Sequence, residues 1–204
     1  MDDIKAVVLD LYGTLVHIAD ELRPYSRLFR ELNLTLGESR LAKKVALTEN
    51  LGLAVLAERI RPDAQIDLRS YEDELSRELD SVKLYPEAVR VLEGLKGKGV
   101  STCVISNLAS PYRKPFFALG LNGLVDYYVF SCEAGFKKPN PAIYRQAIVL
   151  LGVEPRNALM VGDRVLGDVH GPKFIGMNAV LLDRDGKSSY PVKISSLDEV
   201  FSYC

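Results

Sequence analysis

Charged and polar residues follow several strand-like apolar runs in this 204-residue chain, and their side chains suit phosphoryl transfer. In chain order they are Asp10 with Gly13 and Thr14, Ser106 with Asn107, Lys137 with Lys138, and Asp163 with Asp168. Carboxylates can hold a hard cation such as Mg²⁺, while a hydroxyl and an ammonium group bind phosphate oxygens. Asp10 is then free to attack phosphorus and form an aspartyl-phosphate, and Gly13 lets backbone N–H groups approach the anion. The pattern predicts a magnesium-dependent hydrolase.

Each group has an ordinary structural explanation when it is taken alone. An Asp after a strand is usually a cap or turn residue, and Ser106 with Asn107 could cap a helix. Asp168 could be a charge at a helix N-terminus. The groups occur in order, each at the end of an apolar run or the start of a helical pattern, and this joint occurrence favours a common site.

The elements that must position these residues alternate between strands and helices. The apolar runs Ala6–Leu9, Val100–Ile105, Tyr127–Phe130, Ala158–Val161 and Ala179–Leu182 lack strict alternation, which indicates strands buried on both faces. Helical patterns lie between them, among them one that starts at Tyr85-Pro86-Glu87 and one from Pro141 to Leu151 with Gly152 as its C-cap. The alternation predicts an α/β fold with a doubly wound parallel sheet. Strand ends of such a sheet meet at one edge, so the polar groups should converge there.

Residues 17–82 interrupt this alternation. They contain no convincing strand but several amphipathic helical segments, namely Glu21–Leu32, Ser39–Glu49, Leu51–Ile60 and Leu68–Leu79. We therefore expect an α/β core made of residues 1–16 and 83–204, with a helical cap made of residues 17–82. Inserted directly after the first strand, the cap can cover the crevice, exclude water and choose substrates.

Composition narrows the partners. The formal net charge of −1 gives no broad attraction to nucleic acid or to a membrane surface, so we expect a small-molecule substrate. The segment Met1 to Lys5 is acidic where a secretory signal would be basic, and Ala6–Leu9 is too short to cross a bilayer. The three cysteines lack metal-type spacing, and Cys103 lies in an apolar run, which predicts a buried thiol. These features predict a cytoplasmic protein.

The motifs resemble those of the haloacid dehalogenase superfamily, which consists mostly of phosphatases. The matching segments are Asp10-Leu11-Tyr12-Gly13-Thr14-Leu15, Tyr85-Pro86-Glu87, Val104-Ile105-Ser106-Asn107, Lys138-Pro139 to Tyr144, and Gly162-Asp163 through Asp168 to Gly171. The resemblance implies a Rossmann-like core with a small helical cap. It also implies that Asp10 is both nucleophile and metal ligand, that Ser106 holds the transferring group, and that Lys138 neutralises its charge.

The resemblance assigns further roles to the remaining motif residues. Asp163 would bind Mg²⁺, and Asp168 would bind it through water or orient Lys138. Thr14 and Asn107 would be supporting contacts to the substrate, together with Gly13. Lys137 is expected to be a surface neighbour.

Tyr12 departs from the phosphatase pattern. Phosphatases of the superfamily usually carry there a second Asp, which protonates the leaving alcohol, whereas its dehalogenases carry Tyr because a halide leaves without a proton. The metal contact at this position is made by the backbone carbonyl, so Tyr12 could still be a metal ligand, and its hydroxyl could replace the missing acid. Asp163 and Asp168 favour metal-dependent chemistry, because the dehalogenases need no metal.

Three functions remain open from the sequence. The first is Mg²⁺-dependent hydrolysis of a small phosphate ester, or of an acyl or aryl phosphate, through an aspartyl-phosphate. The second is a metal-free 2-haloacid dehalogenase that forms an aspartyl ester. The third is a catalytically weak or inactive binding protein with the same fold. Arg23, Arg40 and Tyr25 are loose candidates for a haloacid-binding cradle, but exposed helix positions explain them better.

Overall fold

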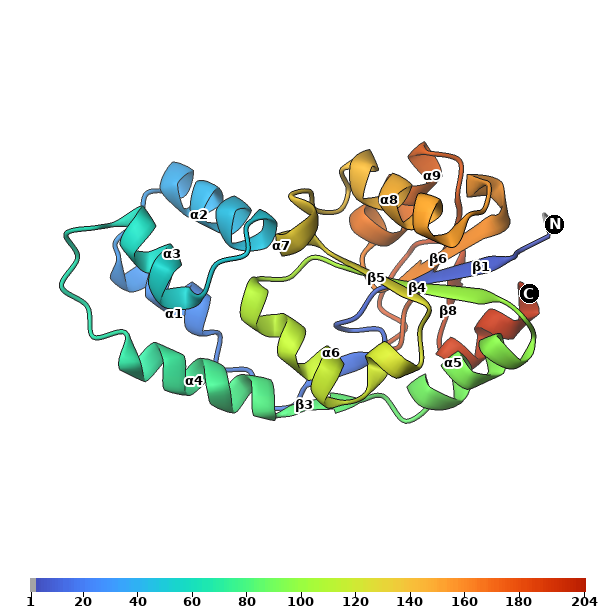
Figure 1. The fold of residues 1–204 in the computed structure, drawn as a ribbon, viewed down its shortest axis with the longest axis horizontal. Coiled ribbons are helices and arrows are strands. Elements are labelled where there is room, and N and C mark those ends of the chain that lie inside the picture. The colour runs from blue at the N-terminus through green and yellow to red at the C-terminus, as the bar shows by residue number, and fades with distance from the viewer. Residues whose placement is uncertain (1–2) are drawn as a thin grey trace.

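A six-stranded parallel sheet with helices on both faces forms the larger part of the molecule in the computed structural model, which describes residues 3–204 (Figure 1). Met1 and Asp2, part of the acidic segment considered above, lie outside the described residues. The strands, in the order in which they pair, are β5 (Tyr127–Phe130), β4 (Ser101–Ser106), β1 (Ala6–Leu9), β6 (Ala158–Gly162), β7 (Asn178–Leu182) and β8 (Lys193–Ile194). Every neighbouring pair is parallel, which confirms the predicted doubly wound α/β fold.

The central strand β1 shows why an apolar run without alternation marks this fold. Ala6 and Val8 belong to one hydrophobic core, whereas Val7 and Leu9 belong to the other, and all four side chains are fully buried. A strand covered on both faces needs apolar residues at every position. β1 pairs with β4 on one side and with β6 on the other. The order in which successive strands are added to the sheet therefore reverses at β1: β4 and β5 lie on one side of it, and β6, β7 and β8 lie on the other.

Each face of the sheet is covered by its own helices (Figure 1). α5 (Ala88–Gly97), α6 (Lys114–Ala118) and the C-terminal 3-10 helix η5 (Leu197–Ser202) contribute to one core, and α8 (Pro141–Leu151) contributes to the other. α7 (Ser131–Ala134) and α9 (Gly171–Phe174) are single short turns. α8 has the predicted bounds, because the Asn140 side chain accepts a hydrogen bond from the backbone N–H of Ala142 and Gly152 ends the helix in the left-handed conformation.

The remaining helices pack together beyond one end of the sheet (Figure 1). This helical segment comprises α1 (Pro24–Glu31), α2 (Leu36–Thr48), α3 (Leu53–Ile60) and α4 (Arg69–Asp80). These helices supply most of two small apolar clusters, against both of which Tyr112 of the core packs. α2 begins before the predicted Ser39, because Thr35 and Glu38 form a capping box at its start. Among residues 3–204, no helix combines the length and the hydropathy that crossing a membrane requires.

The expectation that residues 17–82 contain no strand is wrong. β2 (Val16–Ile18) and β3 (Val82–Leu84) form a two-stranded antiparallel sheet at the base of the helical segment, where the chain leaves the core and returns. Three-residue strands are too short to produce a recognisable hydrophobic period. The pairing depends on residues more than sixty positions apart, which a local pattern does not contain.

Candidate active site

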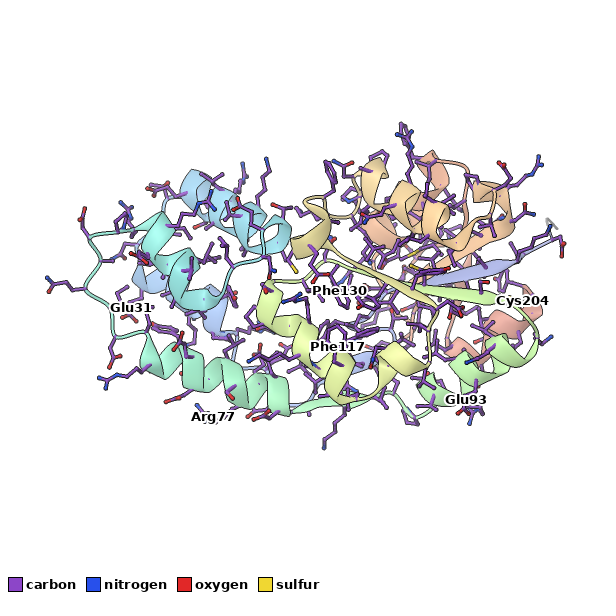
Figure 2. The ribbon with its side chains drawn as sticks, viewed as in Figure 1. Glu31, Arg77, Glu93, Phe117, Phe130 and Cys204 are labelled. Atoms are coloured by element: carbon purple, nitrogen blue, oxygen red, sulfur yellow. The ribbon has the colours of Figure 1, made fainter. Side chains whose placement is uncertain are left out.

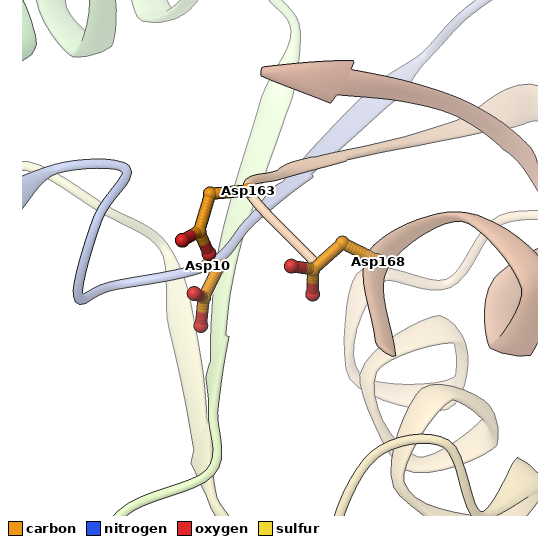
Figure 3. A group of neighbouring side chains, drawn as sticks. All are labelled: Asp10, Asp163 and Asp168. Atoms are coloured by element: carbon orange, nitrogen blue, oxygen red, sulfur yellow. The ribbon is translucent and has the colours of Figure 1, made fainter. Parts of the chain in front are cut away.

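Three carboxylates meet where the central strands β1 and β6 end. Asp10 follows β1 directly, Asp163 follows β6, and Asp168 lies one turn further along in a short π-helix, Val165–His170 (Figure 3). Each of the three offers a carboxylate oxygen within 4.8 Å of the other two. The site lies at the point where the strand order reverses, the usual place for a ligand crevice in an open parallel sheet.

Lys138 connects two of these carboxylates. Its Nζ donates to Asp10 Oδ1 at 2.8 Å and to Asp168 Oδ1 at 2.6 Å, and the residue is only 5% exposed. Asn107 fixes the backbone of Lys138 from the end of the neighbouring strand: the Lys138 N–H donates to Asn107 Oδ1 at 2.7 Å, and Asn107 Nδ2 donates to the Lys138 carbonyl at 2.9 Å. Lys137 is half-buried and takes no part in this ion pairing.

Gly13 and Gly162 make room for the carboxylates. Gly13 adopts a φ of +85°, and a Cβ at this position would lie 2.7 Å from Asp163 Oδ2. A Cβ on Gly162 would lie 2.4 Å from the Asp168 carboxyl group. Both distances are shorter than carbon and oxygen atoms tolerate, so each glycine is required by the close approach of an acidic side chain.

Burial governs the electrostatics of this cluster. It raises the pKa of Asp10 to about 6; the charge of Asp168 adds to the rise, whereas Lys138 opposes it. Burial likewise raises the pKa of Asp163, with Arg164 acting in the opposite direction. For Lys138 burial disfavours the charge, but the carboxylates of Asp10 and Asp168 outweigh it, and the pKa is raised. The three carboxylates thus outnumber the cations beside them, because Lys138 pairs with both Asp10 and Asp168, while Arg164 pairs with Asp163.

The donor set fits a divalent cation. Asp163 Oδ1 is buried and accepts no hydrogen bond from any described residue, while its Oδ2 lies 3.2 Å from Arg164 Nε. An unpaired buried carboxylate oxygen beside two more carboxylates is costly unless a cation compensates it. Oxygen ligands of this kind are those that Mg²⁺ prefers. Asp10, Asp163 and Asp168 are therefore the residues that could hold such an ion.

The Ser106 and Thr14 hydroxyl groups, both predicted to contact the substrate, lie at the end of β4 and in the loop after β1, respectively. Ser106 is the last residue of β4 and is 2% exposed, and its hydroxyl makes no hydrogen bond among residues 3–204. The Thr14 hydroxyl is buried and also has no partner in the described part of the chain. The Ser106 hydroxyl is therefore free of a protein partner, whereas the Thr14 hydroxyl belongs to a fully buried residue and is not exposed to a ligand.

The Tyr12 hydroxyl is engaged elsewhere. It donates to the carbonyl oxygen of Tyr112 at 2.9 Å, and the two rings pack edge to face with their centroids 6.0 Å apart. Burial raises the pKa of Tyr12 above its already high ordinary value, and the charge of Glu78 adds to this rise. A phenol in this state is a poor proton donor at neutral pH. The predicted role of Tyr12 as a substitute acid gains no support from this arrangement.

Arg184, which the sequence reasoning missed, supports the loop that carries Asp10. Its Nη2 donates to the Thr14 carbonyl at 2.9 Å, and its Nη1 donates to Glu87 Oε1 at 2.5 Å. The guanidinium lies over the Tyr85 ring, 3.7 Å from its centroid. Tyr85 and Glu87 belong to the Tyr85-Pro86-Glu87 motif, for which the sequence alone predicted no role. The sequence did offer one indication of Arg184: it lies just after the end of β7, as the other candidate residues lie after the ends of their strands.

Glu78 of α4 was also missed, and it ties the helical segment to the core. The residue is 2% exposed and accepts hydrogen bonds from the backbone N–H groups of Leu22 and Arg23, each at 2.6 Å, and from the Tyr112 hydroxyl. The Arg23 side chain is exposed and pairs with Glu21, so it does not face the carboxylate cluster. Arg40 is exposed as well, as its ordinary helical explanation predicts.

A cavity of about 310 Å³ adjoins the carboxylate cluster. It lies between the helical segment and the core, and Tyr12 and Asn107 form part of its wall (Figure 2 shows the side chains of both parts). Tyr25, one of the loose candidates, lines it too. The carboxylates themselves are not among its lining residues, so the cavity is a neighbour of the reactive groups and not their immediate surroundings.

Comparison with known proteins identifies the family. The model of the haloacid dehalogenase-like hydrolases matches residues 4–176. A phosphoglycolate phosphatase of Aquifex aeolicus (strain VF5) is 30% identical over 186 residues, which cover 87% of this chain and 84% of that protein. The (S)-2-haloacid dehalogenase 4A of Burkholderia cepacia is 28% identical over 199 residues, which cover 91% of this chain and 86% of that protein. The chain spans about half the length of some other curated phosphatases that it matches.

Structural similarity leads to the same family. The crystal structure of a HAD phosphatase from Thermococcus onnurineus superimposes with a TM-score of 0.71 at 26% sequence identity, covering 98% of this chain and 97% of that one. The match extends over the sheet and the helical segment together, since nearly the whole chain is covered. The chain therefore belongs to the haloacid dehalogenase-like hydrolase family.

Proposed function

We propose that this protein hydrolyses small phosphate esters, above all acyl or aryl phosphates, with Mg²⁺ as cofactor and Asp10 as nucleophile. The observation that carries the proposal is the meeting of Asp10, Asp163 and Asp168 with an unpaired buried oxygen on Asp163. A metal-free displacement requires only the carboxylate of the nucleophile and would not require two further acidic side chains beside it. The similarity to the phosphoglycolate phosphatase of Aquifex aeolicus, which extends over 87% of this chain, supports the same reaction class.

The reaction uses the hydrogen bonds already present around Asp10. Lys138 occupies Asp10 Oδ1, which leaves Oδ2 to form the bond to phosphorus while the bond from phosphorus to the leaving oxygen breaks. Lys138 and the Ser106 hydroxyl would bind the phosphate oxygens. Mg²⁺ held by Asp10, Asp163 and Asp168, with the Tyr12 carbonyl, would neutralise negative charge on the phosphate. Water then cleaves the aspartyl-phosphate and regenerates Asp10.

The leaving group sets the substrate preference. Its oxygen takes the electron pair of the broken bond, and an alkoxide needs a proton at that moment. The Tyr12 hydroxyl already donates to the Tyr112 carbonyl, and its pKa is raised. Acyl and aryl phosphates release stable anions that need no protonation. We therefore propose that they are turned over faster than alkyl phosphates.

We further propose that the helical segment acts as a cap. Residues 17–82 enter and leave the core through β2 and β3, and the cavity beside Tyr12 lies between this part and the core. A cap in this position excludes water from the reacting phosphate. Cytoplasmic localisation is proposed on the free thiols of Cys103, Cys132 and Cys204, which a reducing compartment preserves.

The decisive experiment measures hydrolysis of p-nitrophenyl phosphate with Mg²⁺ and with EDTA, using wild-type protein and Asp10→Asn. We expect turnover that depends on Mg²⁺ and is lost in the variant. Equal turnover with and without EDTA would exclude the proposed metal role. The absence of turnover with a panel of aryl and acyl phosphates, while Mg²⁺ still binds, would favour the binding-protein alternative.

A second candidate function, metal-free 2-haloacid dehalogenation, is favoured by Tyr12 and by the similarity to the Burkholderia cepacia dehalogenase. Here Asp10 would form a bond to carbon as the halide departs with the electron pair, and water would hydrolyse the ester. Chloride release from 2-chloropropionate in the presence of EDTA tests it. Release above the buffer blank that disappears in Asp10→Asn would replace the phosphatase proposal.

A further inference from the structure

The cavity beside the active site has mostly apolar walls. Tyr12, Phe29, Leu108 and Tyr112 are among its lining residues, and its volume of about 310 Å³ is near the lower end for small-molecule pockets, which run from about 300 Å³ upward. The phenol groups of Tyr12 and Tyr112 are directed to hydrogen-bond partners in the protein, the Tyr112 carbonyl and Glu78. Tyr25 lines the cavity too, and its hydroxyl is buried and has no partner among the described residues, so a ligand finds few polar groups there. A polyhydroxylated body such as a sugar would leave hydroxyl groups unpaired, which would weaken its binding.

Lys43 of α2 is the only charged residue among those that line this cavity. It is exposed and forms neither an ion pair nor a side-chain hydrogen bond within residues 3–204. Several cationic side chains of the helical segment are paired, among them Arg27 with Glu74, Arg59 with Glu49 and Arg61 with Glu38. Lys43 differs from the other cations without an ion pair in the described residues of this segment because it alone lines the cavity. Lys43 therefore presents an uncompensated positive charge to an otherwise apolar cavity.

Asn107 belongs both to the cavity wall and to the surroundings of the reactive groups. Asn107 lines the cavity and is hydrogen-bonded to the backbone of Lys138, whose Nζ contacts Asp10. Lys43 comes from α2 of the helical segment, whereas Asn107 belongs to the core. A molecule that places its phosphate at Asp10 can thus extend past Tyr12 and Asn107 toward an ammonium group that lacks a partner.

We propose that Lys43 determines specificity by binding a second anionic group of the substrate, a carboxylate, carried on a small apolar body that fills the cavity. This inference rests on the proposed function, because it assumes that the phosphate lies at Asp10. The substrate class is then a carboxylated acyl or aryl phosphate. An ion pair at a partly exposed position is worth up to about 1 kcal/mol, which corresponds to about a fivefold change in affinity.

The test compares 4-carboxyphenyl phosphate with phenyl phosphate, which lacks the second charge. Each ester is assayed with wild-type protein, Lys43→Ala, Lys43→Glu and Lys43→Arg, and with Lys44→Ala as a matched control. Lys44 is the adjacent exposed lysine of α2 and does not line the cavity. The readout is the ratio of the KM values of the two esters, measured for each variant and then compared between variants. The difference between the two leaving groups is the same in every variant and cancels in this comparison.

We expect Lys43→Ala to shift this ratio about fivefold against the carboxylated ester, and Lys43→Glu to shift it further, since the charge is reversed. Lys43→Arg should restore the wild-type ratio, and Lys44→Ala should leave it unaltered. An unchanged ratio in Lys43→Ala, with both esters hydrolysed, overturns the inference and leaves the proposed function standing. An equal shift in Lys44→Ala also overturns it, because a general surface effect would then explain the result.

A separate measurement keeps the inference testable if neither ester is hydrolysed, an outcome that would contradict the proposed function. Calorimetric binding of both esters to wild-type protein and to Lys43→Ala, with Mg²⁺ present, then gives the same comparison without turnover. Tighter binding of the carboxylated ester that is lost in Lys43→Ala supports the role of Lys43. Equal binding of the two esters overturns it.

Discussion

The carboxylate cluster and the neighbouring cavity solve opposite physical problems. At the strand ends the charges are buried and in direct contact: Lys138 is 5% exposed and bonds to both Asp10 and Asp168. In the cavity the walls are largely apolar, and the single cation, Lys43, has no ion-pair partner among the described residues. In the proposed reaction the cluster acts on the charged phosphate, and the cavity accepts the rest of the substrate.

The two regions also depend on different parts of the chain. The cluster is assembled from the ends of β1 and β6 and from the loop that holds Lys138, all parts of the core. Much of the cavity wall comes from α1 and α2 of the helical segment. Substitutions can therefore alter the shape and charge of the cavity without moving the carboxylates, which explains how one reaction can serve different substrates.

The largest expected effect breaks the cluster itself. Asp10→Asn removes the attacking oxygen but keeps the size of the side chain, so we expect hydrolysis of p-nitrophenyl phosphate to fall by about 10⁴-fold or more. Thermal unfolding serves as the control, because a protein that has merely unfolded would lose its transition. Residual turnover of a few per cent in a folded variant would show that another group is the nucleophile.

The next effect concerns the cation. Asp163→Asn removes the carboxylate whose Oδ1 is buried and unpaired in the described structure, and we expect Mg²⁺ activation to require at least about tenfold more metal. The measurement is a Mg²⁺ titration of the turnover rate. Asp67→Asn is the matched control, since Asp67 is exposed in the helical segment. A shift of the same size in the control would mean that the titration reports general electrostatics.

Tyr12→Asp tests the boundary between the two regions, because Tyr12 belongs to the catalytic loop and lines the cavity. The carboxylic acid could protonate a leaving alkoxide, so we expect turnover of alkyl phosphates to rise about 10²-fold, the lower end of general acid catalysis. Phenyl phosphate should gain much less, because its leaving group needs no proton. Equal gains for both classes would indicate that the wider cavity, and not proton donation, causes the change.

The smallest of these effects concerns Arg184, which acts through the loop and not on the substrate. Arg184→Gln removes the guanidinium that holds the Thr14 carbonyl and lies over Tyr85, so kcat should fall about five- to tenfold. KM for phenyl phosphate should change less, since the cavity is intact. Arg90→Gln removes an exposed arginine that pairs with Asp198, and it serves as the control. A rise in KM without a fall in kcat would contradict a positioning role.

Much of the core could be predicted because parallel strands impose strong patterns. β1 and β5 have the predicted bounds, and α8 begins and ends at the predicted residues, since Pro141 and Gly152 mark its termini. The convergence of Asp10 and Asp163 followed from topology alone, because both residues follow strands that end at one edge. The roles of the individual site residues stay predictions until they are measured.

Most of the unpredicted features involve contacts between distant residues. Arg184 meets the Thr14 carbonyl across 170 positions, and Tyr12 meets Tyr112 across 100, without any local periodicity to announce the pair. Lys43 and Lys44 are indistinguishable in the sequence, and only the packing of α2 shows that Lys43 lines the cavity. Such contacts depend on how helices and loops pack in three dimensions.

The bond between Tyr12 and Tyr112 has a consequence for how this loop can change over time. Exchanging Tyr12 alone leaves the Tyr112 carbonyl without its donor and removes the ring that packs against Tyr112. Losing a partly buried hydrogen bond costs about 1 kcal/mol of folding free energy. Replacing Tyr12 with an acid therefore carries a folding cost of this size, which a new donor to the Tyr112 carbonyl would offset.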